Sequence, residues 1–209
     1  MILFRLKQIL AFIITVLSSL SLSISLTIVS SPLIYSLAIP LLNLSEQSGL
    51  SSDQLNENFK VIIHYLLNPM IATLEMPYFS ASSGGLIHFE EVKMLVQFNL
   101  ILSVIGTICL LFIIRWIRQQ NVLTFVGWFN YAVLLPVVIM FLIVVAFDQV
   151  FLIFHQILFN NDLWLFNPAT DPVITVLPQE LFMAYFFIAI LIYEAIILLI
   201  KHMSFRRKA

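Results

Sequence analysis

The chain has 209 residues, 61% of them hydrophobic and 10% charged, and its formal net charge is −1. Soluble domains average about 45–50% apolar and about 25% charged residues, so this composition excludes an ordinary water-soluble domain and predicts an integral membrane protein. The one cysteine, Cys109, excludes an intrachain disulfide and a cysteine-based zinc site, and the lack of a basic stripe with interleaved aromatic residues argues against a nucleic-acid partner.

The first predicted membrane span covers about residues 8–29. A crossing helix needs about 20 mostly apolar residues, and the charge-free stretch that starts here is too long for one such helix. We therefore expect the span to be followed by an apolar excursion through Pro32 and Pro40, and whether residues 32–45 re-enter the membrane stays open. Because a signal peptide has an apolar region of only about 7–15 residues, we expect an uncleaved anchor.

Three further segments pass the same test of length and polarity: residues 94–114, 123–147 and 181–200. Pro136 is expected to kink the third of the four spans. Glu194 is the only acid inside a span, which makes it a functional candidate by default. It lies toward the cytoplasmic end of its helix, where Lys201 or Arg115 could neutralise it, and we therefore expect a structural role.

The basic residues predict the orientation. They precede the first span, separate the second from the third and follow the fourth: Arg5, Lys7, Arg115, Arg118, Lys201, Arg206, Arg207 and Lys208. The positive-inside rule places both termini in the cytoplasm, so that residues 32–93 and 148–180 face outward. The expected fold is an all-α integral membrane protein with four transmembrane helices and a small extracellular cap. We expect a multi-pass protein of the cell membrane whose working face is extracellular.

The sequence has no Gly-rich phosphate loop, no His-Glu-x-x-His helix and no Gly-x-Ser-x-Gly elbow. These absences argue against the familiar metalloproteases and serine hydrolases, and we expect no metal site. Two histidines, His88 and His155, lie just outside predicted spans and on the same side of the membrane. They are the candidate catalytic residues.

His88 lies a few residues before the second span, in the sequence His88-Phe89-Glu90-Glu91. If the helix has already begun, Glu91 at i+3 lies beside the imidazole, raises its basicity and fixes its tautomer. The preceding Gly84-Gly85 lets the backbone approach a ligand closely. The alternative is a helix start with an interfacial histidine that has no catalytic role.

His155 lies in a predicted amphipathic helix along the outer leaflet, which begins near Asp148. Residues seven apart nearly coincide in angle on a helix, so Asp148 and His155 are expected on one polar stripe facing a cavity. Asp148 is about 10 Å away by helical rise, and a partner for His155 is therefore expected from Asn161 or Asp162. The alternative is a solvated interfacial histidine. The following loop is rich in turn residues, and Trp164 suits an interfacial anchor.

These residues together resemble a known family. The block Phe154-His155-Gln156-Ile157-Leu158-Phe159, followed by Trp164-Leu165-Phe166-Asn167-Pro168-Ala169-Thr170-Asp171-Pro172, is similar to the lipoprotein intramolecular transacylases (Lit) of Gram-positive bacteria. The four spans and the stretch around His88 agree with this resemblance, which covers essentially the whole chain. One departure is Glu91, where an aspartate is common in the family.

The resemblance implies an outward-facing enzyme without a cofactor. It would move the sn-2 acyl chain of the S-diacylglyceryl group of a lipoprotein to the α-amine of its N-terminal cysteine, which forms a lyso-form lipoprotein. His88 and His155 match the family's catalytic histidines, and Glu91, Asp148, Asn161, Asp162, Trp164 and Asp171 are expected to support them or to bind substrate. The expected partners are diacylglyceryl-modified lipoproteins and membrane lipids.

The chemistry suits two histidines. An α-amine has a pKa of about 7.7–8.0 and must lose a proton before it attacks an ester, whereas an imidazole with a pKa of about 6.5 can take and return protons. Because amine and ester belong to one molecule, an effective molarity of roughly 10⁵ M or more is within reach and no covalent enzyme nucleophile is needed. Which histidine is the base stays open.

Two alternatives remain. One is a non-enzymatic four-span scaffold or assembly factor whose outer loops bind a partner, for which both histidines would be dispensable. The other is an acyltransferase that takes its acyl chain from a phospholipid. A transporter is disfavoured, because paired broken helices are missing and Glu194 is the only ionisable group inside the spans.

Overall fold

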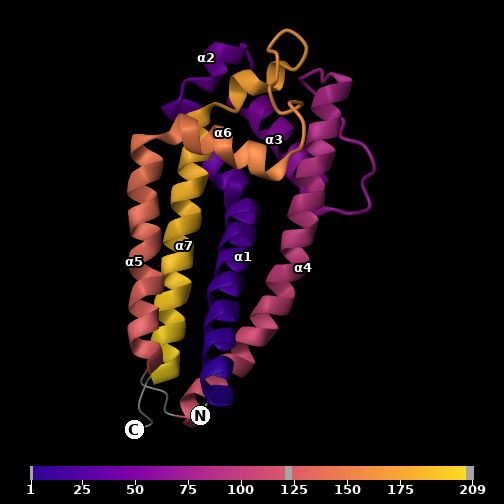
Figure 1. The fold of residues 1–209 in the computed structure, drawn as a ribbon. Coiled ribbons are helices and arrows are strands. Elements are labelled where there is room, and N and C mark those ends of the chain that lie inside the picture. The colour runs from indigo at the N-terminus through magenta and orange to yellow at the C-terminus, as the bar shows by residue number, and fades with distance from the viewer. Residues whose placement is uncertain (1, 121–123, 206–209) are drawn as a thin grey trace. The chain divides into compact units, whose positions relative to one another are not determined.

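The computed structural model describes residues 2–120 and 124–205. Within these residues every regular element is a helix. In chain order (Figure 1) they are α1 Ile2–Leu41, α2 Leu44–Ser48, α3 Ser52–Leu67, α4 Ser83–Gln120, α5 Thr124–Val145, α6 Phe147–Leu158, the 3₁₀ helix η1 Pro172–Val176, and α7 Gln179–Phe205. The predicted all-α fold is confirmed.

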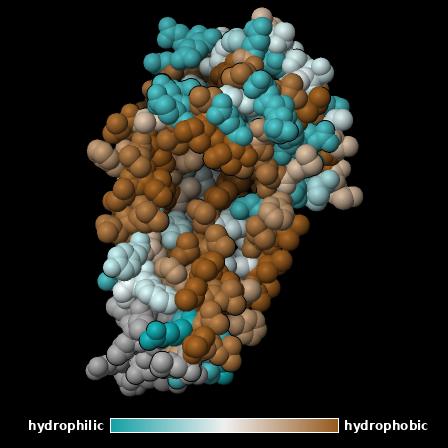
Figure 2. All heavy atoms as spheres, viewed as in Figure 1, coloured by the Kyte–Doolittle hydropathy of each residue, from teal (hydrophilic) through white to brown (hydrophobic). Residues whose placement is uncertain are grey.

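Among the described residues, four helices are long and apolar enough to cross a membrane. The stretches are Ile2–Leu41, Ser83–Gln119, Gly127–Val145 and Gln179–Phe205. The third predicted span began at residue 123, which lies outside the described residues. In Figure 2, hydrophobic side chains cover much of one face along the long helices, as expected for a surface that contacts lipid tails rather than water.

The predicted orientation is not decided by the helices themselves. It depends in part on the basic residues Arg206, Arg207 and Lys208, which lie outside the described residues. The placement of both termini in the cytoplasm therefore stays a prediction, as does the exact extent of each membrane-embedded segment.

The first helix is longer than expected, because it continues through Pro32 and Pro40 to Leu41 instead of ending near residue 29. Proline lacks the N–H that would bond the carbonyl four residues earlier, which for Pro32 is that of Ile28. The Ser31 hydroxyl donates to this Ile28 carbonyl at 2.7 Å and so satisfies the freed acceptor. The helix therefore passes Pro32 without leaving that carbonyl unpaired.

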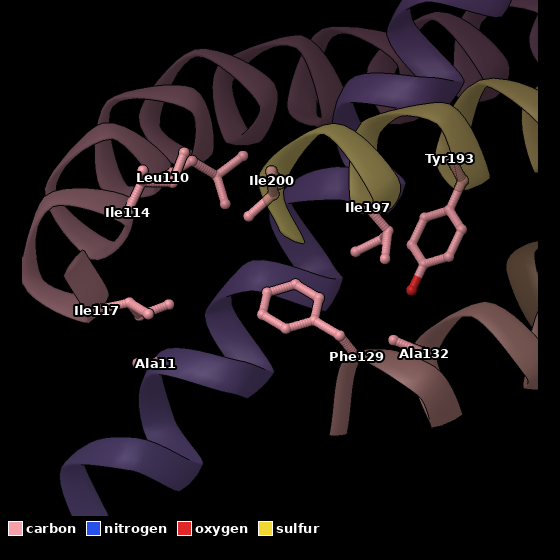
Figure 3. Close-up of a cluster of buried hydrophobic side chains, with 9 residues drawn as sticks. All are labelled: Ala11, Leu110, Ile114, Ile117, Phe129, Ala132, Tyr193, Ile197 and Ile200. Carbon is pink, nitrogen blue, oxygen red and sulfur yellow. The ribbon is translucent and has the colours of Figure 1, made fainter. Parts of the chain in front are cut away.

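The chain forms two compact units. One comprises the described residues of Met1–Thr27, Asn99–Leu142 and Phe187–Ala209, and the other comprises Ile28–Phe98 and Ile143–Phe186. The first unit holds a buried cluster to which α1, α4, α5 and α7 all contribute (Figure 3): Ala11, Leu110, Ile114, Ile117, Phe129, Ala132, Tyr193, Ile197 and Ile200. Since lipid tails are as apolar as these side chains, close van der Waals packing is what favours the association.

A polar contact joins α1 and α4 in this same unit. Asn99 donates through Nδ2 to the Ser25 hydroxyl at 2.9 Å and to the Ser21 carbonyl at 3.2 Å, and the Ser21 hydroxyl lies 3.0 Å from Asn99 Oδ1. Farther along, a Cβ on Gly106 would lie only 2.7 Å from Ser18 Oγ. Small residues of this kind let two membrane helices approach closely enough to exchange hydrogen bonds.

Glu194 does not form the predicted ion pair. Both of its carboxylate oxygens are buried and have no hydrogen-bond partner among the described residues. Lys201, one of the two expected partners, instead donates to Asn130 Oδ1 on α5 at 2.8 Å. Seven residues of helix separate Glu194 from Lys201, about 10 Å by rise, and the lysine meets the Asn130 side chain instead.

The second unit contains α2 and α3. Helix α3 begins with a capping box, in which the Ser51 hydroxyl accepts from the Gln54 amide and the Gln54 side chain accepts from the Ser51 amide. Phe59 on α3 stacks on Tyr35 of α1, with ring centroids 4.1 Å apart and planes at 10°. This stack and the cap hold α3 against the end of α1.

The segment after α3 is fastened to α4. Lys93 donates to the Ile71 carbonyl, and its ammonium lies 4.3 Å from the centroid of the Tyr65 ring. Gln97 donates to the Leu66 carbonyl at 2.7 Å. These contacts come from successive turns of α4 and hold its N-terminal part, where His88 lies, within the second unit.

Candidate active site

The two candidate histidines lie together in the second unit. His88 is on the second turn of α4 and His155 is in the last turn of α6, and their ring centroids are 6.1 Å apart. Figure 1 shows α6 running to the N-terminal part of α4. The fold thus brings together two imidazoles that are far apart in sequence, which is the arrangement that acid–base chemistry by two groups requires.

Aromatic rings enclose His88, which is 8% exposed. Its ring centroid lies 4.7 Å from that of Phe159 and 5.5 Å from that of Phe166, both edge to face. Its Nδ1 is 4.0 Å from Glu91 Oε2, which is too far for a hydrogen bond, and both atoms are buried without a hydrogen-bond partner in the described part of the chain. A carboxylate and an imidazole nitrogen thus face each other across a short gap. Burial, and after it the neighbouring His155, lower the pKa of His88 to about 4, so the increase in basicity expected from Glu91 is not found.

The ring of His155 has a defined orientation. Its Nδ1 lies 2.8 Å from the Phe151 carbonyl, one turn earlier on α6. A carbonyl only accepts hydrogen bonds, so we assign the proton to Nδ1, and the neutral ring then keeps a free lone pair on Nε2. Trp164 also limits how the imidazole can turn, because its ring stacks on that of His155 with the centroids 4.6 Å apart.

Burial lowers the pKa of His155 below its ordinary value, although the hydrogen bond with the Phe151 carbonyl acts in the other direction. Desolvation disfavours the charged imidazolium, and here it outweighs the carbonyl. His155 is therefore neutral at pH 7 and has the form that can accept a proton.

Asn161 lies between the two histidine-bearing helices. Its Nδ2 donates to Glu91 Oε1 at 2.7 Å, which connects the loop after α6 to the helix that carries His88. Its carbonyl accepts from Trp164 Nε1 at 3.1 Å, and its Oδ1 accepts from the Leu163 amide at 3.0 Å. The predicted supporting residues Glu91, Asn161 and Trp164 are thus all beside the histidines.

Asp171 is buried at the N-terminus of α4. Its Oδ1 accepts from the Ser82 amide at 2.8 Å and its Oδ2 accepts from the Thr170 hydroxyl at 2.7 Å. Burial alone would raise the pKa of the Asp171 carboxyl, but the hydrogen bonds from Thr170 and Ser82 outweigh it, and the net effect is a lowered pKa. The carboxylate therefore fastens the loop after α6 to the turn just before His88.

This fastening leaves no room for a side chain at Gly85, and we expect Gly85→Ala to destabilise the protein. The added Cβ would lie 2.2 Å from Asp171 Oδ1, so the carboxylate has to move and its bond to the Ser82 amide is lost. Overpacking of this kind costs about 1–3 kcal/mol. A lower midpoint of thermal unfolding in detergent would show it.

The neighbouring Gly84→Ala is the matched control. Its Cβ would meet nothing closer than Leu163 Cδ2 at 3.3 Å, the end of a flexible side chain. We expect its unfolding midpoint to stay near that of the wild type. Equal midpoints for Gly84→Ala and Gly85→Ala would contradict the role assigned to Asp171.

Two predicted supporting residues are not brought to the histidines. Asp148 and Asp162 are both exposed, and neither is among the groups that contact His88 or His155 in the part of the chain that the structure describes. The face of α6 that carries His155 is aromatic: Phe147, which is buried, and Phe151 lie at intervals of four residues before it. Asp148 and His155 both lie on α6 with the expected spacing of seven residues, but Asp148 is exposed and the α6 side chain in ring contact with His155 from the preceding turns is Phe151.

Sequence reasoning also missed three aromatic residues that surround the histidines. They are Phe151, Phe159 and Phe166. A signal was present for the first two, since each lies four residues from His155 on the same helical face. Among the described residues, no group of three or more His, Cys, Asp or Glu side chains could hold a metal ion.

Comparison with known proteins gives a consistent result. A family model described as lipoprotein intramolecular transacylase Lit matches residues 9–182. The solved structure of the membrane integral lipoprotein intramolecular transacylase Lit from Bacillus cereus is 24% identical, covers 92% of this chain and 91% of that chain, and has a TM-score of 0.81. No curated protein sequence matches significantly.

Two further structures of the Bacillus cereus protein carry a substitution of one histidine, by arginine in one and by alanine in the other. They are 26% and 27% identical to this chain, and both have a TM-score of 0.67. Each covers 96% of this chain, and 93% and 94% of the respective matched chain. The similarity therefore extends over nearly the whole length of both proteins.

Proposed function

The chain belongs to the lipoprotein intramolecular transacylase (Lit) family, and on this basis we propose that it moves the sn-2 acyl chain of a lipoprotein's S-diacylglyceryl group to the α-amine of the same cysteine. The product is an N-acyl, S-monoacylglyceryl lipoprotein. The observation that carries the proposal is the pair of imidazoles whose centroids lie 6.1 Å apart in a site enclosed by aromatic rings. The site faces outward, where lipoproteins of this kind reside.

In the proposed mechanism His88 handles the first proton. The substrate amine has a pKa of about 7.7–8.0, so at neutral pH it arrives mostly as an ammonium. His88 accepts one proton from it and becomes an imidazolium. Burial and the neighbouring His155 oppose this charge and lower the pKa of the free His88 to about 4, and the Glu91 carboxylate, 4.0 Å from Nδ1, is the group placed to offset them. The amine is now neutral and its lone pair is free to attack the ester carbonyl.

His155 handles the second proton. As the amine nitrogen bonds to the sn-2 ester carbon, Nε2 of His155 takes the remaining surplus proton, because its Nδ1–H is already held by the Phe151 carbonyl. The bond between the carbonyl carbon and the glyceryl oxygen then breaks, and the His88 imidazolium protonates that oxygen. His155 finally releases its proton to water, so one proton is set free for each ammonium consumed.

This mechanism needs no covalent acyl-enzyme. Amine and ester belong to one substrate molecule, and effective molarities of about 10⁵ M or more are reached when such groups are held in a reactive geometry. The protein's contribution is to fold the lipid so that the amine reaches the sn-2 carbonyl. The rings of Phe151, Phe159 and Phe166 exclude water around the two histidines and supply apolar contacts for the lipid.

The source of the acyl chain is the test of the intramolecular step. We expect that purified protein, mixed with diacylglyceryl lipopeptide and phospholipid with isotope-labelled acyl chains, gives an N-acyl lipopeptide without label and with unchanged total mass. Mass spectrometry of the peptide reads out both. Label on the amine would instead support transfer from phospholipid and contradict the intramolecular mechanism. A lipopeptide with labelled sn-2 chain and unlabelled phospholipid is the reciprocal control.

A further inference from the structure

Asn161 uses its side-chain donor, its side-chain acceptor and its carbonyl for different partners. Its side chain donates to Glu91 and accepts from the Leu163 amide, and its carbonyl accepts from the Trp164 indole. An Asn whose Oδ1 accepts from the amide two residues later forms an Asx turn, a rigid local geometry. The direction in which Nδ2 points is therefore set by the loop and not by Glu91.

One of these contacts leads to His88. Glu91 lies one turn after His88 on α4 and its side chain is partly exposed, so the carboxylate has room to rotate. The bond from Asn161 Nδ2 occupies Oε1, and Oε2 then remains as the oxygen that faces His88 Nδ1. Without that donor the carboxylate is free to turn away from the imidazole. His88 would then lose the only negative charge that faces it among the described contacts.

Another contact leads to His155. The Asn161 carbonyl accepts from Trp164 Nε1, and the ring of Trp164 stacks on His155 with planes 28° apart. The stack closes one side of the imidazole, while the Phe151 carbonyl determines its tilt. The same residue thus orients the group that faces one histidine and the group that stacks on the other.

We propose that Asn161 is a positioning residue that sets the relative placement of His88 and His155, acting on the first through Glu91 and on the second through Trp164. This inference rests on the proposed transacylase function and deepens it. Asn161 touches neither imidazole in the proposed mechanism, so its effect is expected in the catalytic step and not in substrate binding. A displacement of about 1 Å between reacting groups can lower a rate by roughly 100-fold.

The diagnostic variant is Asn161→Asp. It preserves the oxygen that accepts from the Leu163 amide and the carbonyl that accepts from Trp164, but it replaces the donor to Glu91 by a carboxylate oxygen. Two carboxylates then face each other and Glu91 is displaced. We expect kcat to fall about 10- to 100-fold, since a misplacement of about 1 Å can cost roughly 100-fold, with KM within about twofold of the wild type.

Rescue separates positioning from a general loss of structure. In the double variant Glu91→Gln with Asn161→Asp, the Gln amide donates to the Asp carboxylate, so the same hydrogen bond forms with donor and acceptor exchanged. Because Glu91→Gln also removes the negative charge that faces His88, the reference is the single variant Glu91→Gln, and in that background we expect Asn161→Asp to lower kcat by less than about threefold. The matched control is Asn167→Asp, an exposed Asx-turn residue in the same loop whose Oδ1 accepts from the Ala169 amide. It adds the same charge and is expected to match the wild type.

The outcomes separate two kinds of failure. If Asn161→Asp retains wild-type kcat, or if it lowers kcat by the same factor in the Glu91→Gln background as in the wild type, the positioning role is overturned while the transacylase function stands. If the wild type itself forms no N-acyl, S-monoacylglyceryl product from diacylglyceryl lipopeptide, the proposed function fails instead. Unfolding midpoints of all variants are measured alongside, and a kcat loss that follows a lowered midpoint and is not rescued also overturns the inference.

Discussion

Replacing either histidine with alanine is expected to lower kcat by about 10²- to 10⁴-fold, the usual contribution of a general acid or base. In His155→Ala the base whose Nδ1–H is held by the Phe151 carbonyl is gone, and in His88→Ala no group remains beside Glu91 to protonate the glyceryl oxygen. The double variant His88→Ala with His155→Ala is expected to have a kcat close to that of either single variant, since the loss of either histidine already interrupts the sequence of proton transfers. Initial rates with a saturating diacylglyceryl lipopeptide measure these effects.

His64→Ala is the matched control for these variants. His64 is exposed on α3, near the Asn68 side chain, and it has no place in the site. Its kcat is expected to be that of the wild type. A loss below about threefold in His155→Ala, or the same loss in His64→Ala, would contradict acid–base catalysis by the pair and would return the scaffold hypothesis to consideration.

The second large effect is expected in the pH dependence of kcat. Burial lowers the pKa of His155 from its ordinary value of 6.5, so the imidazole remains neutral at pH 6.5 and charges only below it. The acidic limb of the kcat profile should therefore lie below pH 6.5. Trp164→Ala removes the stacked ring and admits water to the imidazole, and we expect that limb to move up toward pH 6.5.

The folding stability of the protein should also decrease at acidic pH. A folded-state pKa below the unfolded value means that the unfolded state binds more protons as the pH falls, so the contribution of His155 is present above about pH 6.5 and is lost as the pH falls through the folded pKa. Trp116→Ala, which changes a tryptophan of the other unit, is the control for the kcat profile. An acidic limb at or above pH 6.5 in the wild type, or one that Trp164→Ala leaves in place, would contradict this account.

Local spacing made part of the site predictable. Glu91 faces His88 because residues three apart on a helix are neighbours, and this follows from the sequence as soon as a helix is assumed. The hydrogen bond between Asn161 and Glu91 joins residues 70 positions apart, and no periodicity within a helix reports on such a contact. Asp171 was predicted to support the site, but its position at the start of α4 depends on how the loop folds back.

For the membrane helices too, some features could be predicted from the sequence and others could not. Apolar composition and length suffice to predict four long helices, because peptide groups in lipid must be bonded within the helix. The expected break at Pro32 failed, since the neighbouring Ser31 hydroxyl satisfies the freed Ile28 carbonyl. The expected partner of Glu194 failed as well, because Lys201 reaches Asn130 instead. In both cases one side-chain hydrogen bond decided the outcome.

The most direct test of the central claim is mass spectrometry of the N-terminal peptide of a lipoprotein made in cells that produce only the diacylated form. The cells carry the wild-type chain, His88→Ala, His155→Ala or no copy. The account predicts an N-acyl, S-monoacylglyceryl peptide of unchanged total mass with the wild type alone, and a diacylglyceryl peptide with a free amine in the other three. A free amine with the wild type, in cells that express it, would contradict the claim.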